Sequence, residues 1–165
     1  MRFNLVDQII EVEAPRWIRA VKNLTLGEEY LADHFPTFPV MPGVLMLQTL
    51  VEAGAWLLRV SDDFKYSMVV LREAKNVKFG HFVEPGRQLL VTVEATERSG
   101  NLATLKGKGE IEGNQAVSAR LVLECYNLRD LDLSLETKDA KLTAHWRDLY
   151  CLLAGQKKTE QKLVH

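Results

Sequence analysis

The chain of 165 residues is long enough for one domain and a small appendage, and its formal net charge is −1. Hydrophobic residues make up 47% of the sequence, which suffices for a substantial core. A charge this close to neutral excludes a global field that draws proteins to nucleic acid or to membrane surfaces. Cys125 and Cys151 lie far apart and fit no metal or redox spacing, so we expect two reduced thiols, a cytoplasmic protein, and neither metal nor cofactor.

The N-terminal region gives two different patterns. In residues 1–12, Phe3, Val6, Ile9 and Ile10 could share one face, which predicts a short turn or helix. Asp7 interrupts any apolar run there, so we expect no signal peptide. Residues 17–24 alternate between apolar and polar side chains, which predicts a half-buried strand.

Residues 34–43, with the sequence HFPTFPVMPG, form a proline-rich loop ahead of a long apolar stretch. Three prolines leave this loop few conformations, so it can hold the His34 side chain in a fixed place. Pro42 suits the first turn of a helix, whose free N–H groups and positive dipole end then lie beside the histidine. A titratable base, an electrophilic helix end and a dry helix face together predict a site that handles acyl groups.

Residues 44–60 are apolar on nearly every face, which predicts a helix wrapped by other elements. The run from 40 to 60 is close to membrane-spanning length, but it contains Pro42, Gln48, Glu52 and Arg59. We therefore expect a buried helix of a soluble protein and no membrane span.

The second half of the chain is rich in strand patterns. Strands are predicted over 67–79, with an irregularity at 72–75, and over 88–98, 102–111 and 116–126, with turns at 83–86, 99–101 and 112–114. Such a meander implies an antiparallel sheet, and a twisted sheet curled around one buried helix gives an α+β architecture. Apolar residues recur at helical spacing from Leu142 to Leu153, and Gly155 is a plausible helix stop. This pattern predicts a helix that docks on the outside of the sheet or on a neighbouring subunit. A loose polar tail is expected over 156–165.

Three segments resemble one enzyme family. The loop and helix start over 34–45 resemble the signature loop of the 3-hydroxyacyl-acyl-carrier-protein dehydratases, which have the hot-dog fold. Further parts of that family are similar to residues 76–79 together with 83–89, and to the segment over 20–25 that precedes the loop. The resemblance covers roughly residues 15–127, so we divide the chain into a hot-dog domain over 1–127 and a helical extension with a tail over 128–165.

The resemblance implies a site and its partners. It makes His34 the catalytic base and the backbone N–H of Gly43 the group that polarises the thioester carbonyl, and we assign Phe35, Pro42, Val44 and Glu52 to substrate binding. The family acts on acyl groups that an acyl carrier protein presents through phosphopantetheine. Its members are homodimers or trimers of dimers, with each site built from two subunits.

One position departs from the family. A Glu or Asp usually stands fourteen residues after the histidine and donates a proton to the leaving hydroxyl, but this chain has Gln48 there. An amide can orient a hydroxyl, but it cannot donate a proton as a carboxylic acid does. Glu52 lies one turn further, about 6 Å along the helix.

Three hypotheses follow for this departure. The chain is a dehydratase in which Gln48 orients the substrate, with Glu52 as a substitute acid or His34 serving both proton transfers. Alternatively it is a non-catalytic acyl-binding subunit that pairs with an active dehydratase as a heterodimer. Thirdly it is an acyl thioesterase, since hot-dog folds host both chemistries.

Overall fold

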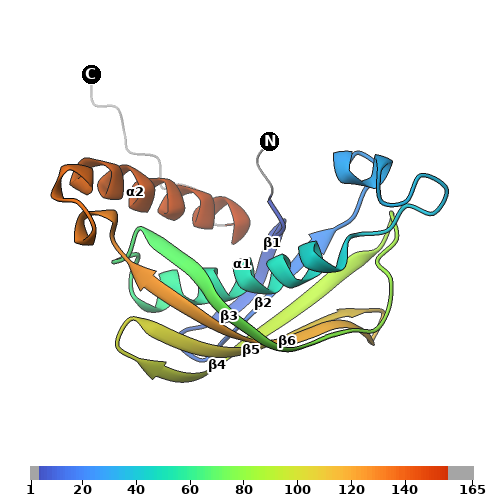
Figure 1. Ribbon diagram of the computed structural model, residues 1–165, viewed down its shortest axis with the longest axis horizontal. Coiled ribbons are helices and arrows are strands. Elements are labelled where there is room, and N and C mark those ends of the chain that lie inside the picture. The colour runs from blue at the N-terminus through green and yellow to red at the C-terminus, as the bar shows by residue number, and fades with distance from the viewer. Residues whose placement is uncertain (1–3, 156–165) are drawn as a thin grey trace.

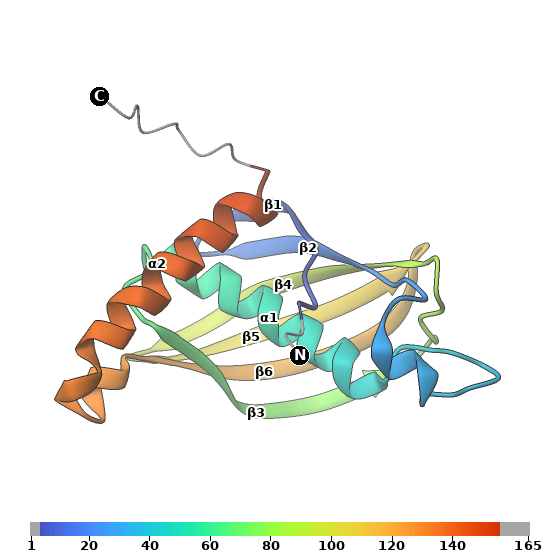
Figure 2. The ribbon, with the colours of Figure 1, turned by 90° about the horizontal axis from the view of Figure 1, so that it is seen from above.

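The fold is a curved antiparallel sheet that holds one long helix in its concave face (Figures 1 and 2). The computed structural model describes residues 4–155. The central helix is α1 (Gly43–Ser61), and the strand order is β1-β2-β4-β5-β6-β3. The strands are β1 (Gln8–Glu13), β2 (Trp17–Asn23), β3 (Met68–Phe79), β4 (Gln88–Ser99), β5 (Leu102–Ile111) and β6 (Asn114–Tyr126). This is the hot-dog fold of the α+β class, as the sequence predicts.

Helix α1 packs closely on the sheet because glycines stand where the two layers approach each other. A Cβ on Gly54 of α1 would lie 3.2 Å from the Leu123 side chain, and one on Gly107 of β5 would lie 3.2 Å from that of Leu50. Within residues 4–155, α1 is the one helix whose length and apolarity would suffice to cross a membrane, but 61% of that apolar stretch is buried in the domain. Its apolar surface is therefore accounted for by the core.

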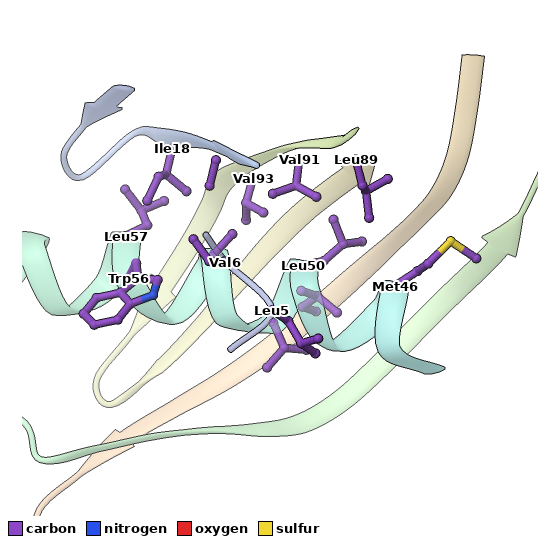
Figure 3. Close-up of a cluster of buried hydrophobic side chains, with 14 of the residues drawn as sticks. Leu5, Val6, Ile18, Met46, Leu50, Trp56, Leu57, Leu89, Val91 and Val93 are labelled. Atoms are coloured by element: carbon purple, nitrogen blue, oxygen red, sulfur yellow. The ribbon is translucent and has the colours of Figure 1, made fainter. Parts of the chain in front are cut away.

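The core lies between α1 and the inward side chains of the strands (Figure 3). Leu89, Val91 and Val93 alternate along β4 and are all fully buried, as the period-two pattern predicts. They meet Leu50 and Leu57 of α1, while the N-terminal segment covers another side of the helix with Leu5 and Val6.

The prediction of a turn or helix over residues 1–12 was wrong, because β1 is a strand that pairs with β2. The register of this pair shifts between Ile9 and Glu11, and this bulge breaks the period-two alternation by which a strand is recognised. Ile10 is therefore exposed instead of sharing a buried face with Val6 and Ile9. Phe3 lies outside the described residues.

The irregularity expected in the strand over 67–79 is confirmed. The pairing of β3 with β6 shifts register between Leu71 and Glu73, and again between Lys75 and Lys78. β3 is an edge strand, so its second side has no strand partner within residues 4–155.

The C-terminal helix α2 (Glu136–Leu153) packs on the α1 side of the sheet (Figure 2). Its Trp146 ring meets Trp56 of α1 edge-to-face at 5.9 Å, and the Trp146 indole N–H donates to the Ser67 carbonyl at 2.9 Å. The expected docking on the outside of the sheet was wrong, because Trp146 and Tyr150 of α2 pack on Trp56 of α1. The alternative, docking on a neighbouring subunit, stays a prediction. Gly155 has φ +65°, which suits the expected helix stop.

One carboxylate fixes the start of α2 to the segments just before β3 and just after β6. Asp139 accepts hydrogen bonds from the Leu128 N–H at 2.8 Å, the Arg129 N–H at 2.9 Å and the Ser67 hydroxyl. The tail predicted over 156–165 lies outside the described residues. The boundary between 127 and 128 stays a prediction.

Candidate active site

Hydrogen bonds with the backbone of Val40 fix both the backbone and the ring of His34. The Val40 N–H donates to the His34 carbonyl, and the His34 Nδ1 lies 3.0 Å from the Val40 carbonyl oxygen. A carbonyl can only accept, so this contact places the proton on Nδ1 and leaves the Nε2 lone pair as the basic position. The ring is partly buried and stacks on Phe35 at 4.2 Å, and the peptide bond between them is cis.

Helix α1 begins directly after this loop without a capping side chain. Pro42 is the N-cap, and its carbonyl accepts from the N–H groups of Leu45 and Met46, so the earlier N–H groups of the helix have no intrahelical partner. The N–H of Met41 donates to the Val83 carbonyl at 2.9 Å. Two of the three segments that resemble the family, the histidine loop and the segment that includes the turn at 83–86, therefore meet in space.

The start of α1 is covered by an aromatic side chain. A Cβ on Gly43 would lie 3.1–3.3 Å from the Phe79 ring, so this ring packs directly on the helix start. Around it Phe35 and Val44 are exposed, at 51% and 70%, while Pro42 is partly buried. Three further exposed aromatic residues at this loop were not predicted: Phe38, Phe79 and Phe82. Phe38 and Phe79 lie in segments that resemble the family, so the recurrence of Phe there was the available signal, whereas Phe82 lies outside these segments and contacts the Phe38 ring.

Gln48 and Glu52 line one cavity, and His34 of the same chain does not. The cavity has a volume of about 280 Å³ and lies between α1, the N-terminal segment, β3 and α2. Gln48 is exposed, whereas Glu52 is partly buried. A single chain therefore brings together the predicted amide and acid but leaves the predicted base outside their cavity.

The environment of Glu52 favours its protonated form. Burial raises the pKa of this carboxyl group above its ordinary value. The Leu5 N–H, which donates to Oε2 at 3.0 Å, and the neighbouring Gln48 amide lower the pKa, but they offset the effect of burial only in part. Glu52 therefore keeps its proton to a higher pH than an exposed glutamate. A carboxyl group that keeps its proton to a higher pH is better suited to donate one to a leaving group.

Metal ligands do not gather at this site. Within residues 4–155, no group of three or more His, Cys, Asp or Glu side chains is arranged to hold a metal ion. The remaining described histidines, His81 and His145, are exposed and lie outside the cavity that holds Gln48.

The fold and this loop define a class of protein: a hot-dog domain with a fixed histidine ahead of its central helix. The chain belongs to the FabA-like domain family, which matches residues 1–120. It is 38% identical to the 3-hydroxyacyl-[acyl-carrier-protein] dehydratase FabZ of Streptococcus suis over 117 residues, which are 71% of this chain and 83% of that protein. It is 36% identical to the FabZ of Streptococcus pyogenes serotype M3, over 73% of this chain and 86% of that protein.

Solved structures of low sequence identity share the fold. The dehydratase heterocomplex ApeI:P from Xenorhabdus doucetiae aligns with a TM-score of 0.66 at 16% identity, over 81% of this chain and 90% of that one. The protein smu.793 of Streptococcus mutans, solved with acetyl CoA, aligns with a TM-score of 0.58 at 10% identity, over 76% of this chain and 92% of that one. These structural similarities support the assignment of the hot-dog fold.

Proposed function

We propose that this protein removes water from (3R)-hydroxyacyl thioesters on acyl carrier protein and forms trans-2-enoyl thioesters, in fatty-acid or related lipid biosynthesis. The observation that carries the proposal is the contact between His34 Nδ1 and the Val40 carbonyl, which leaves Nε2 as a base beside the start of α1. The 3-hydroxyacyl-[acyl-carrier-protein] dehydratases to which the chain is similar supply the reaction class.

The proposed reaction uses the groups of the loop in sequence. His34 Nε2 takes the proton from the carbon next to the thioester carbonyl, and the Gly43 N–H stabilises the charge that develops on the carbonyl oxygen. The bond from C3 to its hydroxyl then breaks, and the hydroxyl leaves as water after it receives a proton. Phe35, Pro42 and Val44 provide the apolar approach to this point.

We assign the proton on the leaving hydroxyl to Glu52 and the orientation of that hydroxyl to Gln48. Both side chains line one cavity, and Glu52 retains its proton to a raised pH. The cycle balances because His34 gains one proton, Glu52 loses one, and a later proton transfer between them resets the site.

The site then requires two subunits. Since His34 of one chain does not line the cavity of the same chain, we propose that His34 of one copy faces the cavity of a second copy in a homodimer or a trimer of dimers. We further propose that the protein is cytoplasmic and receives its substrate from acyl carrier protein through phosphopantetheine.

Gln48 favours a second candidate function. A chain with an amide at the position of the usual acid suits a non-catalytic acyl-binding subunit that lends His34 or structural support to an active dehydratase in a heterodimer.

The test is to incubate the purified chain with a 3-hydroxyacyl thioester and to follow enoyl formation. We expect turnover in the wild type, and a loss of about 10²–10⁴-fold in His34→Ala and in Glu52→Gln, the range for losing a general base or acid. Gln48→Glu serves as the comparison. An inert wild type that gains turnover in Gln48→Glu would support the non-catalytic subunit. Release of free thiol without enoyl product would identify a thioesterase and overturn the proposal.

A further inference from the structure

Arg59 is a buried cation of α1 that forms no ion pair in the described part of the chain. Arg59 is only 9% exposed, and its Nε has no hydrogen-bond partner within residues 4–155. The guanidinium lies over the faces of two indoles, 5.2 Å from the centroid of Trp56 and 4.3 Å from that of Trp146. Burial lowers the pKa of Arg59 to about 10, and the charges of Cys125 and Glu52 offset this lowering only in part.

Arg59 lines the same cavity as Gln48. The two residues are eleven positions apart on α1, which places Arg59 about 16 Å further along the helix axis. Glu52 is the acidic side chain of this cavity, but it lies two turns from Arg59, about 10 Å along the axis. The cavity therefore begins at the predicted reaction centre and ends at a cation that forms no ion pair within residues 4–155.

The wall between these two ends is largely apolar. It includes Met68 and Val69 from β3, and Leu149 and Leu153 from α2. Such a wall suits the methylene groups of an acyl chain, whereas the guanidinium at its end does not suit a terminal methyl group. A methyl group there would remove the remaining water from Arg59 and return no hydrogen bond.

We propose that this cavity receives acyl chains that carry a carboxylate at the end remote from the thioester, and that Arg59 binds this carboxylate. The proposal rests on the proposed function for the position of the thioester. A guanidinium binds a carboxylate through two parallel hydrogen bonds, and these are strong where water is excluded. The Arg59 side chain leans toward the helix N-terminus, so the span fits a chain of about ten to twelve carbon atoms.

The two indoles help to orient the guanidinium and do not compete for the ligand. Arg59 already lies over a face of each indole, so that face is not available to an aromatic chain end. A carboxylate meets the edge of the guanidinium instead, where its N–H groups lie.

The binding test does not depend on turnover. The probes are the monomethyl ester of dodecanedioic acid and methyl dodecanoate, which differ in the terminal carboxylate, and the readout is the affinity measured by calorimetry on the full chain. We expect the half-ester to bind at least tenfold more tightly to the wild type. Arg59→Met, which keeps an unbranched side chain and removes a buried charge, is expected to fold and to lose this preference. Arg59→Lys should retain part of it.

Three results would overturn the inference: equal affinity for the two probes in the wild type, a preference that survives in Arg59→Met, or tighter binding of a methyl ester with a terminal phenyl group. Turnover of thioesters separates this proposal from the proposed function. Enoyl formation without any preference for a terminal carboxylate removes the inference alone. A retained binding preference without enoyl formation removes the dehydratase activity alone.

Discussion

At the scale of single residues, the site depends on which groups can hold or release a proton. The Val40 carbonyl accepts from His34 Nδ1 and thereby fixes the tautomer in which Nε2 is the basic nitrogen. Replacement of the usual acid by Gln48 leaves Glu52 as the carboxyl group of the cavity, and partial burial raises the pKa of that group.

The raised pKa of Glu52 predicts how stability depends on pH. A carboxyl group with a higher pKa in the folded state than in the unfolded state stabilises the fold fully below the unfolded pKa, which is about 4.3 for glutamate. This contribution disappears as the pH rises through the folded pKa. Glu52→Gln has no such charge to bury and can still accept from the Leu5 N–H. Its free energy of unfolding relative to the wild type should therefore rise between pH 4 and pH 8, measured by urea denaturation.

Glu97→Gln provides the control, because Glu97 lies on an exposed part of β4. A pH-dependent gain of the same size in this variant would show that the effect is not specific to Glu52. A constant difference for Glu52→Gln across the range would contradict the assigned burial of its carboxyl group.

At the scale of elements, α2 completes the core and closes one side of the cavity. Its contacts come from one face, where Trp146 packs on Trp56 and Tyr150 meets Phe64 at 5.8 Å. The opposite face includes Leu152, which is 74% exposed. The helix is thus held by a few aromatic contacts, by the ion pair of Arg147 with Asp63 and by Asp139 at its start.

Trp146→Ala should loosen α2. The change removes a half-buried ring, its hydrogen bond to the Ser67 carbonyl and its contact with Arg59, so we expect the free energy of unfolding to fall by about 2–4 kcal/mol. Thermal and urea denaturation measure this change. Leu152→Ala removes a large side chain from the other face of the same helix and should stay within about 0.5 kcal/mol of the wild type. Equal losses in the two variants would contradict the packing of α2 on α1.

At the scale of the whole molecule, exposed apolar side chains gather along one edge of the sheet. β3 is a twelve-residue edge strand, and it carries Leu71 and Phe79, which are 37% and 54% exposed. Long edge strands with apolar side chains tend to pair with another chain. Together with a base that lies outside the cavity of its own chain, this edge supports assembly of two copies.

Leu71→Arg should therefore weaken the proposed dimer. A charge placed at a strand edge that pairs with another copy loses its hydration there, so we expect more monomer in sedimentation experiments and at least a tenfold loss of turnover. Leu102→Arg is the matched control, because Leu102 is 38% exposed but lies on the interior strand β5. A dimer that is as stable in Leu71→Arg as in Leu102→Arg would exclude this edge as the interface.

Much of the fold could be predicted because its signals are local. Prolines fix backbone angles wherever they occur, which defines the loop after His34 and the start of α1. The alternation in β4 and the turns that join β4, β5 and β6 are equally local. The bulge in β1 removed that alternation, and the N-terminal strand was therefore missed.

The sequence by itself determined the central helix, the meander of strands and the loop that holds His34, because each depends on residues within a few positions of one another. The tertiary structure decided where α2 packs, that Glu52 is partly buried against Leu5, and that Arg59 lies at the end of the same cavity and forms no ion pair among the described residues. These features join residues separated by tens of positions, such as Arg59 and Trp146. Burial and the loss of water at such contacts arise only when distant segments pack together, and no local pattern encodes them.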